Sequence, residues 1–191
     1  GLVVGCLDAD GAVDEVVLRR LVALAAPLPL TFHRAIDVAS DPLAALDACA
    51  RCGVARVLSS GGALTAADGA ATLRAMVARA SATPAGRPAL TIAAGGGVRE
   101  ENACALVRAT GVHELHASAR VTVPCRTRHR RAAGPIFMGG EKRNGPESEY
   151  ELQVASRERV AALVGRLRLV AAGGPGGGAA GGSHRDSRRS S

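Results

Sequence analysis

The chain has 191 residues, enough for one domain with a large core, and 47% of them are hydrophobic against 21% charged, as in soluble globular proteins. Aromatic residues make up only 2%, which disfavours a nucleic-acid partner because base-stacking modules need aromatic faces. No apolar run approaches the roughly 20 residues that span a bilayer, so no membrane contact is expected. The net charge of +7 gathers between residues 120 and 143 and beyond residue 173, which leaves the remainder close to neutral.

Short apolar runs alternate with helical patterns along the chain. The runs are Leu2–Leu7, Leu30–Arg34, Ala55–Ser60, Leu90–Ala94 and Glu114–Ser118. The predicted helices cover about 13–26, the stretch from Asp41-Pro42 to Gly53, a segment carrying Leu73, Met76 and Val77, about 99–110, and a segment opening near Ser156, preceded by a long basic loop. Five βα units in succession predict a parallel sheet.

Polar residues at alternate positions decide between two parallel architectures. Thr31 and His33 alternate with apolar neighbours in the second run, as Glu114 and His116 do in the fifth. A doubly wound strand is apolar on both faces, whereas a barrel tolerates a polar layer beneath its active-site loops. The predicted fold is therefore α/β, a partial TIM-like (β/α)8 barrel of five parallel strands with outer helices. The three further strands of a full barrel are expected before Gly1.

The predicted domain organisation is an incomplete barrel over residues 1–170 and a disordered tail, rich in Gly, Ser and Arg, over residues 171–191. Five strands cannot close a barrel. An unpaired edge strand pairs readily with other chains, so a homo-oligomer is an expected form of this protein.

The five cysteines do not form the pattern of a secreted disulfide scaffold. Their number is odd and their spacing irregular, so a reducing, cytoplasmic setting is the simpler interpretation. Cys49 and Cys52 have C-x-x-C spacing, but they end a helical segment just before Gly53, where the helix dipole disfavours a thiolate. We interpret this pair as apolar core residues in preference to a redox or metal site.

Four residues at the ends of predicted strands are candidates for catalysis. His33, Arg34 and Asp37 follow the second run, and His116 ends the fifth. The carboxyl ends of barrel strands carry the active site. Imidazole can act as acid, base or ligand, and guanidinium holds a carboxylate or phosphate through two hydrogen bonds. The alternative is that Asp37 pairs with Arg34 or His33 and only fixes the loop.

Three further strand ends are predicted to bind a cofactor or a small anion. Their residues are Ser60, Gly61, Gly95, Gly96, Gly97 and Ser118. Loops after the last two strands of a barrel often form a phosphate site from backbone N–H groups, and glycine lets the backbone approach an anion closely. The alternative is that these glycines only form tight βα turns.

Five stretches, taken in order, resemble the CutC copper homeostasis protein family. They are Gly5–Gly11, Leu30–Asp37, Ala55–Gly61, Ala94–Val98 and Glu114–Arg120. Thr-Phe-His-Arg-Ala-x-Asp is the most specific of them, and the resemblance extends to about Leu167. It implies a TIM-like barrel that begins at the family's fourth strand and a cytosolic role in copper handling.

The resemblance does not identify metal ligands, because the family's proposed copper-binding cysteines lie in the part that is missing here. Cys6 is the only thiol expected near His33 and His116. Three functions stay open: a CutC-type protein that binds a copper ion, an enzyme acting on a small phosphate- or carboxylate-bearing substrate, and a truncated fragment without activity. Thiol-dependent copper retention would favour the first, and an anion ordered at Gly96 and Gly97 the second.

Overall fold

The computed structural model describes residues 1–82, 89–134, 136 and 150–171, and its five parallel strands pair in chain order. The strands are β1 (Leu2–Val4), β2 (Leu30–Phe32), β3 (Arg56–Ser59), β4 (Thr91–Gly95) and β5 (Glu114–His116). The register aligns Leu2 with Leu30, Thr31 with Arg56, and Arg56 with Thr91. A doubly wound sheet would reverse its strand order at a switch point, so the sequential order confirms the predicted α/β class of successive βα units.

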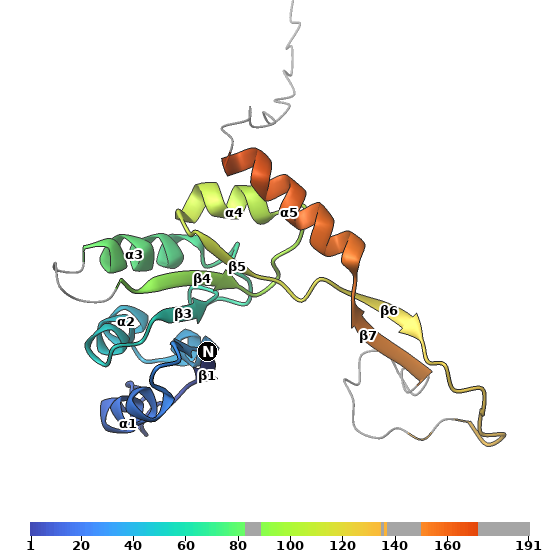
Figure 1. Ribbon diagram of the computed structural model, residues 1–191, viewed down its shortest axis with the longest axis horizontal. Helices are drawn as coiled ribbons and strands as arrows, with labels where there is room; N and C mark the ends of the chain where they lie inside the picture. The colour runs from blue at the N-terminus through green and yellow to red at the C-terminus, as the bar shows by residue number, and fades with distance from the viewer. Residues whose placement is uncertain (83–88, 135, 137–149, 172–191) are drawn as a thin grey trace, which may run out of the picture.

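The helices follow one another along one side of this sheet (Figure 1). They are α1 (Glu15–Ala25), the 3₁₀ helix η1 (Arg34–Val38), α2 (Pro42–Arg51), α3 (Ala70–Ser81), α4 (Ala103–Thr110) and α5 (Arg157–Ala171). Right-handed crossovers between parallel strands in sequential order keep α1, α2, α3 and α4 on the same face. The last helix, α5, follows β7 and contacts α4.

Two helices begin later than the sequence predicts, because local hydrogen bonds fix the residues before their first turns. The first helix was expected from about residue 13 but begins at Glu15, because the Asp14 carboxylate accepts the N–H of Val17 at 2.9 Å and caps the helix. The fourth was expected from Arg99 but begins later, because the Arg99 N–H donates to the Asn102 side chain at 2.9 Å and closes a turn there.

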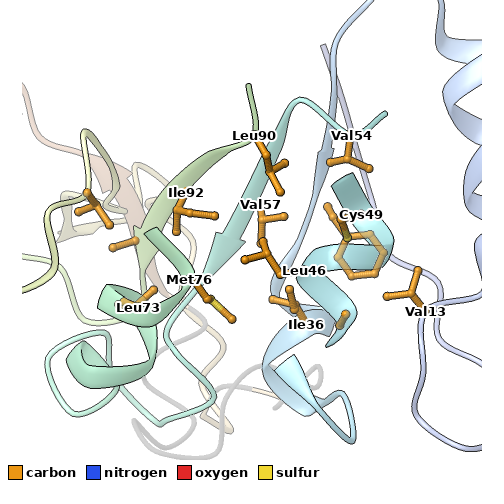
Figure 2. Packing of buried hydrophobic residues seen from close by; sticks show 14 of the residues in the cluster. Val13, Ile36, Leu46, Cys49, Val54, Val57, Leu73, Met76, Leu90 and Ile92 are labelled. Carbon is orange, nitrogen blue, oxygen red and sulfur yellow. The ribbon is translucent and has the colours of Figure 1, made fainter. Parts of the chain in front are cut away.

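The hydrophobic core lies between the sheet and these helices (Figure 2). Phe32, Val57 and Ile92 project from neighbouring strands toward the helices and are almost fully buried. Cys49 and Cys52 belong to the same core, as the packing interpretation required. Burial raises the pKa of the Cys49 thiol to about 12, with a smaller contribution from the neighbouring thiols, so this cysteine stays protonated.

The opposite face of the sheet carries a polar layer. Arg56 of β3 forms a two-point ion pair with Glu114 of β5, reaching across β4, and its Nη1 lies 3.4 Å from the hydroxyl of Thr31. The predicted alternation of polar and apolar residues therefore marks a real face, with Thr31 and Glu114 on the side away from the helices.

The basic stretch after β5 contains two strands that the sequence prediction missed. β6 (Arg120–Pro124) and β7 (Glu151–Ala155) form an antiparallel pair in which Val121 faces Val154 and Val123 faces Leu152. The prediction of a continuous loop is wrong because cross-strand contacts between these apolar residues stabilise the pair. Figure 1 shows the pair extending away from the five-stranded sheet.

The predicted tail begins where α5 ends. Ala171 is the last residue of α5, and the remainder of the tail, residues 172–191, lies outside the described residues. Within the described part of the chain, no helix has the length and apolarity needed to cross a bilayer.

Candidate functional site

A cavity of about 750 Å³ opens at the carboxyl ends of β3, β4 and β5. The sheet contributes Gly96, Gly97, His116 and Ser118 to its lining, and Arg34 reaches it from η1. The β6–β7 pair and the first turns of α5 line it as well. Its volume lies in the range of small-molecule sites.

Asp37 is the buried anchor beside this cavity, with its side chain 6% exposed. Its carboxylate accepts hydrogen bonds from the Ser59 hydroxyl at 2.6 Å, from the backbone N–H groups of Ser60 and Gly62 at 3.0 and 3.1 Å, and from Arg34 Nε at 2.7 Å. Burial favours the neutral acid, but these donors outweigh it and hold the pKa of Asp37 below its ordinary value. Asp37 is therefore a saturated anion that positions its neighbours.

Arg34 is fixed by that anchor and keeps a donor free. Its Nη2 donates to the Ser60 hydroxyl at 2.7 Å and lies 3.4 Å from the carbonyl oxygen of Ala63. Among the described residues, its Nη1 has no hydrogen-bond partner. A β-carbon placed on Gly96 would lie 3.4 Å from Nη1, so the guanidinium lies directly over the glycine backbone. This arrangement presents an oriented cationic donor to the cavity.

The glycines at the end of β4 leave room for this arrangement. Gly96 has φ +104° and Gly97 φ +68°, both in the region that favours glycine. Gly95 is buried, and a β-carbon there would meet a methyl group of Leu58 at 2.7 Å. Gly96 and Gly97 line the cavity, whereas Gly95 only lets the strand pack closely.

Ser60 and Gly61 lie behind the cavity lining and hydrogen-bond to neighbouring residues of the site. The Ser60 hydroxyl accepts from Arg34 and lies within hydrogen-bond distance of the carboxylate of Asp37 and the carbonyl of Ala63. The N–H of Gly61 donates to the hydroxyl of Ser59 at 2.8 Å. Both residues are buried and neither lines the cavity.

The two predicted histidines lie at the same edge of the sheet in different surroundings. The His33 ring packs over Gly5, and its Nδ1 accepts the N–H of Ala35 at 3.0 Å. Nδ1 is thereby occupied, and the neutral ring carries its proton on Nε2. His116 is exposed and lines the cavity. Strands β3 and β4 lie between the strands that precede the two imidazoles.

No three-residue metal site of His, Cys, Asp and Glu is formed by the residues that the structure describes. Cys6, the predicted thiol candidate, follows β1 and approaches the carbonyl oxygen of Asp14 at 3.7 Å. Burial raises the pKa of its thiol, and the charges of Asp14 and Cys52 add to the effect. Cys6 therefore belongs to no three-residue group of His, Cys, Asp and Glu among the described residues.

Sequence reasoning missed part of the cavity lining. Gln153 of β7 and Arg159 of α5 face the sheet-derived residues across the same cavity. The alternation of apolar residues in 121–123 and 152–154 is the one local signal that could have revealed the strands that place Gln153. Nothing local identifies Arg159 among the other arginines of its helix.

Successive βα units with a polar site at the carboxyl edge define a barrel-type α/β protein. The model of the CutC family matches residues 1–121, which include the whole sheet side of the cavity. The chain belongs to the CutC family. A family protein CutC from Chromobacterium violaceum is 44% identical over 163 residues, which cover 85% of this chain and 61% of that protein. One from Xylella fastidiosa strain 9a5c is 46% identical over 126 residues, covering 66% and 45%.

A mouse relative and a solved structure complete the comparison. The copper homeostasis protein cutC homolog of Mus musculus is 35% identical over 163 residues, which cover 85% of this chain and 56% of the mouse protein. The crystal structure of CutC from Streptococcus agalactiae matches with a TM-score of 0.54 and 29% identity, covering 61% of this chain and 54% of that one. The chain thus spans about half to three fifths of the length of these proteins.

Proposed function

We propose that this protein acts in copper homeostasis in the cytoplasm, and that it does so by binding and converting a small substrate bearing a phosphate or carboxylate in the cavity. The role follows the name of the mouse relative, and the cytoplasmic location is supported by five free cysteines. The single observation that supports the chemistry is the free Nη1 of Arg34, held over Gly96 by a saturated carboxylate.

The residues of the cavity divide the work of such a site. Arg34 binds the anionic oxygen by a charge-assisted hydrogen bond. Gly96 and Gly97 let the ligand approach the backbone, and the Ser118 hydroxyl lies in the same lining. His116 is an imidazole of the described lining, and imidazole often serves as the general acid or base of an active site. Asp37 and Ser60 act only by positioning Arg34.

Calorimetric titration with inorganic phosphate, sulfate and acetate tests this proposal. The wild-type protein should bind at least one of them, and Arg34→Met should weaken that binding about 10- to 100-fold, the value of a hydrogen bond between charged groups. Arg74→Met is the matched control, because Arg74 is exposed on α3 away from the cavity. Equal affinity in the wild type and in Arg34→Met would contradict the proposal.

Copper carried directly as cargo is the second candidate, because Cu(I) prefers thiolate ligands. Cys49 and Cys52 lie in the hydrophobic core and Cys6 packs against it, although the described residues form no three-residue group of His, Cys, Asp and Glu that could hold a metal. A competition titration of Cu(I) against a chromogenic chelator tests this candidate. Stoichiometric retention should fall in Cys6→Ser and Cys52→Ser and persist in the control Cys104→Ser. Retention unchanged in all three variants would exclude a site at these thiols.

A further inference from the structure

The far wall of the cavity carries a second set of cationic donors. Arg120 begins β6 and Arg159 lies in the first turn of α5. Arg99 also lines the cavity, but from the sheet side, because it follows β4 and Gly97. The acidic residues of this lining are Glu100 and Glu101. None of these residues contacts the Asp37 anchor, so this set is held independently of Arg34.

Arg159 is oriented by a backbone carbonyl and forms a long ion pair with Glu100 that leaves some of its donors free. Its Nη1 donates to the backbone carbonyl of Arg120 at 3.1 Å. Its Nε is 3.9 Å from Glu100, which is too long for a hydrogen bond. Ser156, which is buried, accepts the N–H of Arg159 at 3.2 Å and fixes the first turn of α5. In the described residues, Nη2 of Arg159 and the guanidinium of Arg120 have no hydrogen-bond partner.

The cavity is too large for one inorganic anion to fill. Arg34 lies at the sheet side and Arg159 at the helix side, and Leu58 and Leu163 also line the space. Most of a small-molecule ligand is normally in contact with its site. A ligand that uses both arginine sets must therefore carry an anionic group at each end of a short carbon framework that can pack on the leucines.

We propose that the cavity selects substrates with two anionic groups, one bound by Arg34 over Gly96 and the other by Arg159 together with Arg120. This inference rests on the proposed function, and it names the substrate class of the same site. Donors at both ends of the cavity discriminate against a ligand with a single anionic group, because such a ligand leaves one set of donors without a partner.

Titration with propylphosphonate and propane-1,3-bisphosphonate distinguishes the proposed function from this inference. The two probes share a carbon chain and differ in the second anionic group. The bisphosphonate should bind at least tenfold more tightly to the wild type. Arg159→Met should remove that advantage while leaving propylphosphonate affinity unchanged, and Arg34→Met should weaken both. Arg157→Met, on the same helix but outside the lining, is the matched control.

The outcomes are distinguishable. Binding of propylphosphonate with no gain from the second phosphonate overturns the inference and leaves the proposed function standing. Binding of neither probe overturns both. Arg120→Gln keeps the carbonyl that holds Arg159 and serves as a second variant if Arg159→Met does not fold. A full bisphosphonate advantage in either folded variant would also overturn the inference.

Discussion

Two arginine–carboxylate pairs of this protein use the same residue types in different ways. At the carboxyl edge of the sheet, Arg34 pairs with Asp37, whose side chain is 6% exposed. On the face of the sheet away from the helices, which we call the inner face, Arg56 pairs with Glu114, whose side chain is 36% exposed. Arg56 spends two nitrogens on Glu114 and directs the third to Thr31, whereas Arg34 keeps Nη1 free above the cavity.

The difference shows how an ion pair can leave one of its donors available to a ligand. The inner pair is closed, because both partners satisfy each other. At the edge, the carboxylate is satisfied by Ser59, Ser60 and Gly62 as well as by Arg34, so the guanidinium is fixed in place without using up its donors. Burial of the carboxylate and the number of its other donors decide whether the guanidinium keeps a free donor.

Removing the buried anchor should give the largest effect. Asp37→Asn leaves Arg34 without its charge partner and the donors of Ser59, Ser60 and Gly62 without a charged acceptor, and should lower the free energy of unfolding by about 3 kcal/mol. Affinity for phosphate should fall at least tenfold. Urea unfolding and calorimetry measure the two effects. Asp10→Asn, at an exposed carboxylate, is the control and should stay within about 0.5 kcal/mol of the wild type. If Asp37→Asn lowers the free energy of unfolding by less than the coupling of about 1 kcal/mol expected for Arg56 and Glu114, the distinction between the two pairs is wrong.

Closing the space above Gly96 should give an intermediate effect on stability and a large effect on binding. Gly96→Ala places a residue at φ +104° and brings its β-carbon to 3.2 Å from that of Ser60, for a cost of about 2 kcal/mol. Gly134→Ala introduces a similar backbone strain at φ +82° with nothing within 4 Å. Only the Gly96 variant should lose anion affinity. Equal anion affinities in Gly96→Ala and Gly134→Ala would show that anion binding by Arg34 does not require close approach of the ligand to the Gly96 backbone.

The inner pair should contribute less and should not affect binding. A double-mutant cycle with Arg56→Met and Glu114→Gln should give a coupling of about 1 kcal/mol, because both side chains are more than a third exposed and solvent screens them. Phosphate affinity should be the same in all four proteins. A change in affinity would place Arg56 in the binding machinery and remove the distinction between the pairs.

The two carboxylates should also separate in their dependence on pH. Hydrogen bonding from Arg56 lowers the pKa of Glu114, and the pKa of Asp37 lies below its ordinary value as well. A lowered pKa means that each contribution is complete above the ordinary value, 4.5 for Glu114 and 3.8 for Asp37, and is lost as the pH falls through the folded value.

Unfolding measured from pH 6 to pH 2 checks this order. The stability difference between the wild type and Glu114→Gln should shrink first as the pH falls, and the difference from Asp37→Asn should persist to lower pH. These changes should be the smallest of the set for Glu114, because its side chain is the more exposed. Loss of the Asp37 contribution above pH 4.5 would contradict the assignment of a saturated anchor.

The sheet could be predicted from local signals, and the C-terminal strand pair could not. Apolar runs followed by helical patterns indicate βα units, and the alternation around Thr31 and Glu114 indicates the polar inner face. Pairing of Val121 with Val154 joins residues far apart in the chain, and both lie in a stretch dominated by charge. The short apolar alternation in 121–123 and 152–154 indicates two strands, but it does not indicate that they pair with each other at that distance.

The site was predictable in its composition and not in its geometry. The sequence indicated Arg34, Asp37 and the glycines after β4, and it offered the pairing of Arg34 with Asp37 as an alternative. The structure shows this pairing, which orients the free nitrogen on which the proposed binding role rests. Which nitrogen stays free depends on Gly96, contributed by another strand, and only the tertiary structure brings the two together.

Strand pairing in chain order has a consequence for how the site comes into being. Each parallel strand pairs with strands of the neighbouring βα units, so the sheet can grow by closing one short loop at a time, which keeps the entropy cost of each step low. The far wall of the cavity is formed by β6, β7 and α5, which are the last described elements in chain order. Any ligand that bridges both walls therefore binds only the fully folded protein, and by mass action it stabilises that final segment against unfolding.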